Sequence, residues 1–370
     1  MKKIVFILPI LFATLLTYAQ QPIKNNKVFT SLEDALKTPL EVYKLNLSKQ
    51  SLEKLPKEIS ILKNLEELSL QNNLLTSLPT EIGSLVNLKT LSIYKNKLKS
   101  LPKELSQLQN LSELYLSSND LKKFPKEITS LKNLVTLEIS FNNIGELPKE
   151  IASLRNLERL FINKCDIKNL PQEISALDKL IVLNMEINPL KTFPTQISTL
   201  KNLQYLGISE TKLTSFPTEL IEMKQLLSLG LIGNDLKSIP PQIGQLKKLQ
   251  KLFLDSCNLT ILPPEIGELK ELEQLYISKN KLKAIPIQIG QLINLTSLNA
   301  TNNQLTSIPK EIGNLQKLYF LVLSNNQIST IPKEILSLKK LGSFYLDNNF
   351  IPASEQATIK NLMPKCTIKF

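Results

Sequence analysis

One stretch of the chain decides the fold: Leu65-Glu-Glu-Leu68-Ser-Leu70-Gln-Asn-Asn73-Leu-Leu75-Thr-Ser-Leu78-Pro79-Thr-Glu-Ile82-Gly-Ser-Leu85. Leu68 and Leu70 alternate with polar residues, which is the period of a half-buried strand. After Pro79, Ile82 and Leu85 are three residues apart, and that spacing suits a short 3₁₀ or α-helical turn with the proline at its first position. The stretch therefore predicts one short strand followed by one helical turn.

The same unit recurs along the chain with a period of 23 residues. Thirteen prolines, from Pro56 to Pro332, keep this spacing without interruption. Fourteen copies run from Val42 to Ile351 and match the leucine-rich repeat pattern L-x-x-L-x-L-x-x-N/C-x-L. Strands about 4.8 Å apart on one side and wider helical turns on the other must curve the stack. We expect an α/β solenoid, a horseshoe with a parallel sheet on its concave face and short 3₁₀ or α turns on its convex face.

Composition argues against most enzymes. The 370 residues include 45 Lys plus Arg and 33 Asp plus Glu, a net charge of +12, and no histidine. Without imidazole the chain cannot form a Ser-His-Asp or Cys-His nucleophile or offer histidine to zinc. Four carboxylates expected on the concave side resemble parts of an acid/base pair, but the sequence fixes no geometry for them: Glu138, Glu186, Glu210 and Asp255. We expect no catalytic residue, no metal and no cofactor.

The first residues read as an export signal. Lys2 and Lys3 precede an apolar run that ends at Leu16, and the small residue Ala19 follows. A basic start, an apolar stretch and a small-residue cleavage site are typical of a secretory signal, here residues 1–19. A retained anchor helix is the alternative, but the run is too short to span a bilayer and no later apolar stretch of about twenty residues exists. We expect an exported protein in the periplasm, at the cell surface or released.

Two caps should close the ends of the repeat array, which occupies residues 42–351. An N-terminal cap is expected over residues 20–41, with Ser31 starting a short helix that ends before Pro39. A C-terminal cap is expected over residues 352–370, with a helix over 354–363 and a strand over 365–370. The open ends of a solenoid need such caps. We expect the protein to be a monomer.

One position of the unit forms a ladder through the repeats. It carries asparagine in ten repeats, and the other four hold Gln50, Cys165, Thr211 and Cys257. A buried asparagine here would satisfy backbone groups where the chain leaves the strand. Cys165 and Cys257 lie four repeats apart, about 19 Å by strand spacing, so they cannot form a disulfide. We expect both to be free and buried, and Cys366 to lack a partner.

Three further segments point to one group of repeat proteins. They are Leu32–Lys37 with Val42–Leu47, the repeated Leu-Pro-Lys-Glu-Ile as at 147–151, and Leu362-Met-Pro-Lys-Cys366. With these the chain resembles secreted leucine-rich repeat proteins that are abundant in pathogenic spirochaetes and occur in other Gram-negative bacteria. The resemblance implies a non-enzymatic, surface-associated or released binding protein, in some relatives linked to adhesion to host cells or matrix. It does not identify a ligand.

The strand residues that face away from the core should form the ligand surface. In the middle of the array two adjacent strands carry glycine, and aromatic residues lie on either side. We expect an apolar, aromatic trough that binds a protein or peptide. The alternative is that the aromatic residues pair across strands and only stabilise the sheet. The candidate ligand-binding residues are Tyr94, Tyr115, Phe141, Phe161, Val182, Ile187, Tyr205, Gly207, Gly230, Ile232, Phe253 and Tyr276.

A second candidate surface is basic. Lysines that follow the ladder position should line one flank of the solenoid: Lys97, Lys99, Lys122, Lys123, Lys168, Lys191, Lys212, Lys237, Lys281 and Lys283. Such a flank could attract sulfated glycans or acidic headgroups, or it could serve solubility alone. An exported protein has little access to nucleic acid. Three functions therefore remain open: a protein-binding surface protein, a polyanion or glycan binder, and a periplasmic structural protein.

Overall fold

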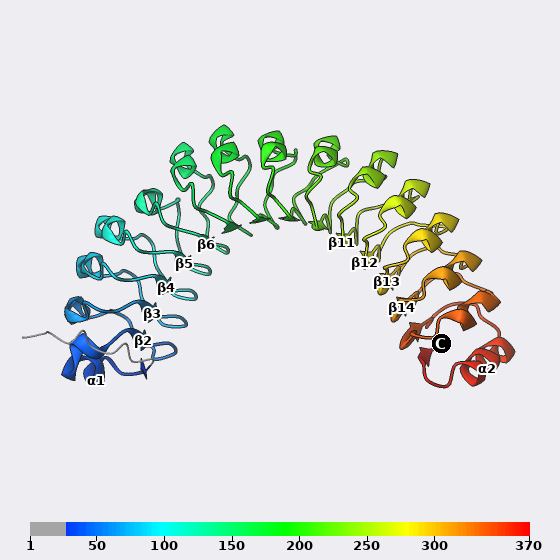
Figure 1. Cartoon of the computed structure of the whole chain (residues 1–370), viewed down its shortest axis with the longest axis horizontal. Coiled ribbons are helices and arrows are strands. Elements are labelled where there is room, and N and C mark those ends of the chain that lie inside the picture. Colours follow the sequence, from blue (N-terminus) through cyan, green and yellow to red (C-terminus); the bar gives the residue numbers. More distant parts are fainter. Residues whose placement is uncertain (1–26) are drawn as a thin grey trace, which may run out of the picture.

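The computed structural model describes residues 27–370, which form one open arch (Figure 1). Sixteen strands of this part pair in chain order as a single parallel sheet on the inner side, and helical turns line the outer side. The predicted horseshoe is therefore confirmed. The predicted signal, residues 1–19, lies outside the described residues, as does the start of the N-terminal cap.

The strands are short because only one or two core leucines of each unit need to reach the sheet. They are β1 (Val28–Phe29), β2 (Lys44–Asn46), β3 (Glu67–Ser69), β4 (Thr90–Ser92), β5 (Glu113–Tyr115), β6 (Thr136–Glu138), β7 (Arg159–Phe161), β8 (Val182–Asn184), β9 (Tyr205–Gly207), β10 (Ser228–Gly230), β11 (Lys251–Phe253), β12 (Gln274–Tyr276), β13 (Ser297–Asn299), β14 (Phe320–Val322), β15 (Ser343–Tyr345) and β16 (Thr367–Lys369). From β2 to β15 the register advances by 23 residues at each step, as in the pair of Leu68 with Leu91. Equivalent side chains therefore stack in columns along the arch.

The outer side consists of 3₁₀ turns, with one α-helix at each end. The helices are α1 (Leu32–Lys37) and α2 (Ala353–Leu362), and the 3₁₀ turns are η1 (Pro39–Glu41), η2 (Lys57–Ile61), η3 (Thr80–Ser84), η4 (Lys103–Gln107), η5 (Lys126–Ser130), η6 (Lys149–Ser153), η7 (Gln172–Ala176), η8 (Thr195–Thr199), η9 (Thr218–Glu222), η10 (Pro241–Gln245), η11 (Pro264–Glu268), η12 (Ile287–Gln291), η13 (Lys310–Asn314) and η14 (Lys333–Ser337). The periodic proline precedes each of the turns η2–η14 rather than starting it. Pro79, for example, is the N-cap with ψ 151°, so the expected first-turn position is wrong by one residue. Extended ψ at the proline directs the chain outward before the turn begins.

The core is a continuous column of aliphatic side chains between the sheet and the turns. Leu68, Leu70 and Ile82 of one unit are 1% exposed or less, and their equivalents along the array are similarly buried. The predicted asparagine ladder closes this column at the strand ends. Asn73 Oδ1 accepts from the amides of Gln50 and Leu52, and its Nδ2 donates to two carbonyls, at distances of 2.8–3.0 Å. The ladder therefore satisfies buried backbone groups, as predicted.

The ladder alternates in the middle of the array, where Cys165, Thr211 and Cys257 take the place of every second asparagine. In a regular repeat the residue after the ladder donates backward, as Lys97 N–H does to Leu75 O. At the three substituted repeats the bond is reversed, and the preceding repeat donates forward to the ladder carbonyl. The residue after each of these ladder positions has positive φ: Asp166 (59°), Lys212 (63°) and Asn258 (57°). The ladder residue thus selects between two loop conformations on this edge.

Both ends of the sheet are covered. Ser31 Oγ accepts from Asp34 N–H at 3.3 Å and caps α1, as its sequence suggested. The short strand β1 then pairs with β2, a strand that the repeat pattern does not reveal. At the other end α2 precedes β16, which pairs with β15. Hydrophobic residues on these end segments pack against the core column, among them Phe29 and Ile359.

Candidate functional site

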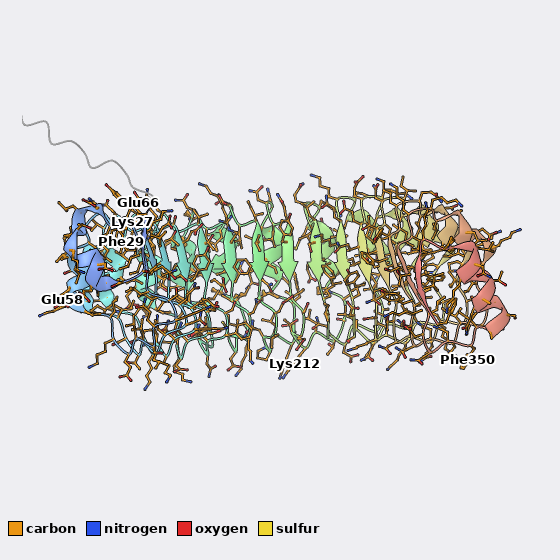
Figure 2. All side chains as sticks on the ribbon, turned by 90° about the horizontal axis from the view of Figure 1, so that it is seen from below. Lys27, Phe29, Glu58, Glu66, Lys212 and Phe350 are labelled. Atoms are coloured by element: carbon orange, nitrogen blue, oxygen red, sulfur yellow. The ribbon has the colours of Figure 1, made fainter. Side chains whose placement is uncertain are left out.

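The concave face is formed by three columns of residues along β2–β15: the first and third residue of each strand and the second residue after it. Figure 2 views this side of the arch. The three columns hold three cations, Lys44, Arg159 and Lys251, and twice as many carboxylates: Glu67, Glu113, Glu138, Glu186, Asp255 and Asp347. The chain as a whole carries +12. The concave face is therefore acidic on a basic protein.

The predicted ligand-binding residues divide between this face and its edge. Six occupy the third strand position: Tyr115, Phe161, Gly207, Gly230, Phe253 and Tyr276. Two occupy the first strand position, Val182 and Tyr205, and two lie two residues after a strand, Tyr94 and Ile232. Phe141 and Ile187 lie three residues after β6 and β8, at the edge where the chain leaves the sheet. The structure thus brings ten of them onto one face and separates two.

The centre of the concave face is polar, which differs from the apolar trough that the sequence predicts. A methyl group built on Gly207 would lie 2.6 Å from Asn184 Oδ1 and 3.1 Å from Glu186 Oε1. One built on Gly230 would lie 3.3 Å from Ser209 Oγ and 3.6 Å from Glu186 Oε1. Polar side chains from two strands therefore extend over the glycines, because no side chain opposes them there.

Two groups in this centre have no partner within the described residues. The Ser209 hydroxyl is buried and makes no hydrogen bond there. The half-buried Glu186 is held by its backbone, since its amide donates to Asn163 Oδ1 at 2.9 Å. Within residues 27–370, no hydrogen bond or ion pair engages its carboxylate. Other concave carboxylates are engaged: Glu138 accepts from Ser117 Oγ at 2.8 Å, and Asp255 accepts from Ser278 N–H at 2.9 Å.

Part of the aromatic set serves the sheet itself. Phe253 and Tyr276 form an edge-to-face pair with centroids 5.3 Å apart, so this pair fits the stabilising alternative. The Tyr115 hydroxyl donates to Glu113 at 3.2 Å, and burial, followed by the Glu113 charge, raises the pKa of Tyr115. Phe161 contacts no other ring within the described residues. Within the described residues, Phe161 and Tyr205 are the concave aromatic residues that have neither a ring partner, a side-chain hydrogen bond nor a lysine over the ring.

One column at the edge has a constrained backbone. The residue just before the ladder has positive φ in all fourteen repeats, between 49° and 70°. This left-handed region suits glycine, asparagine and small or flexible residues, and costs a β-branched or aromatic residue most. The column holds Lys49, Asn72, Lys95, Ser118, Phe141, Lys164, Ile187, Glu210, Gly233, Ser256, Lys279, Asn302, Asn325 and Asn348. Phe141 and Ile187 are the two unfavourable members.

These two residues line an open depression of about 770 Å³ at the ends of β5–β9. Phe141 is 48% exposed and Ile187 is 41% exposed. Lys164 lies between them along the column, with its Nζ 5.7 Å from the Phe141 ring centre. Asp166 and Lys212, from the reversed loops, line the same depression. Two strained apolar side chains therefore face solvent two repeats apart.

The predicted basic flank lies along this same edge. All ten lysines are exposed, and Figure 2 shows Lys212 at the long edge opposite Glu66. Within residues 27–370 only Lys237 of the ten forms an ion pair, with Asp235 at 3.8 Å. Lys122, Lys123 and Lys168 border a second depression of about 760 Å³. The flank is thus a basic edge beside an acidic face, with Asp120, Asp166 and Glu146 interspersed among its lysines.

One aromatic pair escaped sequence reasoning. Tyr319 and Phe320 pack edge to face with centroids 4.7 Å apart, yet both remain about half exposed. The Tyr319 ring lies directly over Gly342, which has no side chain to displace it. The signal was available, because Gly342 is the only glycine in its column of the repeat.

The cysteines and acidic groups offer no metal centre in the part of the chain that the structure describes. Cys165 and Cys257 are buried and free, as predicted, and burial raises the pKa of each thiol to about 12. Cys366 is free and half-buried, and burial raises its pKa as well. No helix within residues 27–370 is long and apolar enough to cross a membrane.

Comparisons with known proteins agree with this geometry. Residues 40–144 and 194–285 match the model of a leucine-rich repeat region, and residues 293–351 match that of a leucine rich repeat. The chain belongs to the leucine-rich repeat family. Proteins of this family are typically non-enzymatic binding modules. A search of curated proteins found no match to this leucine-rich repeat protein.

Solved structures similar to this leucine-rich repeat protein come from bacteria and plants. A leucine-rich repeat protein of Leptospira interrogans is 39% identical with a TM-score of 0.85, and the match covers 94% of this chain and all of that one. A plant peptide hormone receptor, solved in complex with its peptide, is 31% identical with a TM-score of 0.67, over 88% of this chain and 54% of the receptor. An internalin of Listeria monocytogenes shares the fold at 22% identity, with a TM-score of 0.68 over 90% of this chain and 88% of that one.

Proposed function

We propose that this leucine-rich repeat protein is an exported, non-enzymatic module that binds a protein ligand through its concave face and the adjoining edge, in adhesion or host interaction. The repeat family and a receptor relative solved with a peptide support protein binding. The basic and apolar start of the sequence supports export. The sequence contains no histidine, and no group of side chains within residues 27–370 could hold a metal ion, so neither feature favours an enzyme.

The observation that carries the proposal is the pair Phe141 and Ile187. Their backbone conformation disfavours them, their exposure gains little hydrophobic stabilisation, and asparagine occupies the same column in four other repeats. Strained residues that folding does not require are typical of binding sites. Exposed apolar side chains beside polar ones are also the usual anchors of protein interfaces. A ligand that covers them explains both properties.

Affinity capture tests the proposal. The purified protein is immobilised and exposed to extracellular matrix and host membrane extracts, beside a variant with Phe141→Asn and Ile187→Asn. Asparagine suits the backbone of this column, so the variant keeps its fold. We expect the natural chain to retain a partner protein, and the variant to retain about tenfold less of it or lower still. Equal capture by both chains excludes this edge as the anchor. A separate experiment treats living cells with protease, and a protein that stays intact would favour a periplasmic role.

A second candidate rests on the nine flank lysines without an ion pair. Sulfated glycans would bind such an edge through many weak contacts that salt screens. Elution from a heparin column distinguishes the two functions. Binding that disappears between about 50 and 500 mM NaCl, and falls when Lys122, Lys123 and Lys168 are changed to Gln, supports the glycan function.

A further inference from the structure

The centre of the concave face combines a charge, a hydroxyl and two adjacent glycines. Glu186 Oε1 lies beside both glycines, within 3.1 Å and 3.6 Å of the positions that their Cβ atoms would take. Ser209 Oγ lies beside the same Gly230 position, at 3.3 Å. Neither the carboxylate nor the hydroxyl has a partner within residues 27–370. An unpartnered buried hydroxyl is costly in a folded protein, which indicates that something else engages it.

The charge of the surrounding surface points to the nature of that partner. Six carboxylates and three cations occupy the concave columns of a chain that carries +12. Lys44 already pairs with Glu67 at 2.8 Å, and Arg159 lies 3.7 Å from Glu158 outside these columns. Glu186 has no such neighbour. The potential at the centre therefore favours a positive group.

Aromatic residues lie on either side of the two glycines. Gly207 and Gly230 lie on the adjacent strands β9 and β10 and leave both without a side chain at this position. Phe161 lies on β7, two strands from β9, and Phe253 lies on β11, next to β10. An arginine or lysine entering between these rings could place its stem against apolar surface and its head on carboxylate and hydroxyl oxygens. Charge-assisted hydrogen bonds of this kind are the stronger ones in interfaces.

We propose that Glu186 and Ser209, which lie beside Gly207 and Gly230, form a pocket for a basic side chain of the protein ligand. The inference rests on the proposed concave binding function and adds the chemistry of the ligand. It also changes the expectation of an apolar trough into one of a polar pocket between aromatic residues.

Selection from a random twelve-residue peptide display library tests the pocket. Three full chains are used as bait: the natural protein, Glu186→Gln, and the matched control Glu138→Gln, whose carboxylate already has Ser117 as a partner. Both substitutions keep side-chain shape. We expect one Arg or Lys position to be enriched with the natural chain and with Glu138→Gln, and not with Glu186→Gln. Selected peptides resynthesised with citrulline in place of arginine should bind about tenfold more weakly.

Failure of the pocket can be told apart from failure of the concave face. Selected peptides that lack a basic position, or whose binding is unchanged by Glu186→Gln, overturn the pocket. If such peptides are nevertheless lost from a chain with Phe161→Ala and Phe253→Ala, the concave binding function stands without it. Peptides that bind all of these variants equally overturn both.

Discussion

The amide of Gly145 donates to the carbonyl of Cys165 at 3.0 Å, across two neighbouring repeats. In a regular repeat the bond runs in the opposite direction. The amide of the residue after the ladder asparagine donates to a carbonyl of the preceding repeat. The same forward bond joins Lys191 to Thr211 and Lys237 to Cys257. Lys191, Lys237 and the neighbouring Lys212 belong to the basic edge. The buried ladder residue therefore influences the backbone conformation of exposed lysines.

Cys165→Asn should restore the regular loop at this repeat. A ladder asparagine favours the backward bond, so the Gly145 amide is expected to lose its acceptor and exchange with solvent about tenfold faster or more. Hydrogen exchange of the full chain measures this, with the Lys237 amide as the internal reference. If Gly145 keeps its protection, the ladder residue does not select the loop.

Asn188→Ala should be strongly destabilising. Asn188 Oδ1 accepts from the amides of Cys165 and Ile167 at 2.9 and 3.0 Å, and its Nδ2 donates to Ile162 O and Met185 O, both at 2.8 Å. Four buried groups lose their partner, so we expect unfolding free energy to fall by about 3 kcal/mol or more. Urea denaturation measures it. Asn143→Ala, at the exposed neighbouring edge, is the control and should change it by less than about 0.5 kcal/mol.

The thiols should react in a fixed order. Burial raises the pKa of Cys165 and Cys257 to about 12, so at pH 8 only Cys366 should be labelled by a maleimide, with all three labelled in denaturant. In the unfolded chain these thiols ionise near pH 9, and in the folded chain they remain protonated. Their effect on stability is therefore neutral at pH 7, and unfolding free energy decreases as pH rises from 9 toward 12. Rapid labelling of two or three thiols in the native protein would contradict the burial.

Relief of the edge strain should stabilise the protein. Phe141→Asn and Ile187→Asn are each expected to raise unfolding free energy by about 1 kcal/mol, because asparagine tolerates the left-handed region. Asn302→Ile, at the same position of another repeat, should lower it by a similar amount. Denaturation midpoints of the three variants decide the matter, and a loss of stability in the first two would show that these side chains serve the fold.

Close packing of the outer turns should make Gly267 intolerant of a side chain. A Cβ there would lie 2.5 Å from Gln288 O of the next turn. We expect Gly267→Val to cost about 2 kcal/mol or more. Ser175→Val, at the equivalent position of η7, is the control, since Ile221 shows that a large side chain fits this position elsewhere. Equal denaturation midpoints for the two variants would contradict the close approach.

The period of the sequence is sufficient for the fold because each unit repeats the same core side chains. Strands, turns, ladder and the free cysteines follow from it. The proline position was wrong by one residue, since fixed φ suits both the N-cap and the first turn residue. β1 was missed because two residues carry no period, and only their pairing with β2 reveals them.

The candidate site was less accessible from the pattern. The glycines were recognised, but side chains from neighbouring strands, above all Glu186, determine what occupies their space. The same holds for the strain at Phe141 and Ile187, which depends on a positive φ that the other twelve residues of the column adopt at lower cost. Such properties arise between repeats, whereas the pattern describes one repeat at a time.

The 23-residue register gives the protein a built-in scale. Each additional or deleted unit would shift the rest of the array by one strand, about 4.8 Å, and would change hydrogen bonds only in the two units that border it. The distance between the acidic centre at Glu186 and either capped end can thus change only in whole steps. Gain or loss of a repeat by recombination would resize the ligand surface while leaving the pocket, which spans β8–β10, intact.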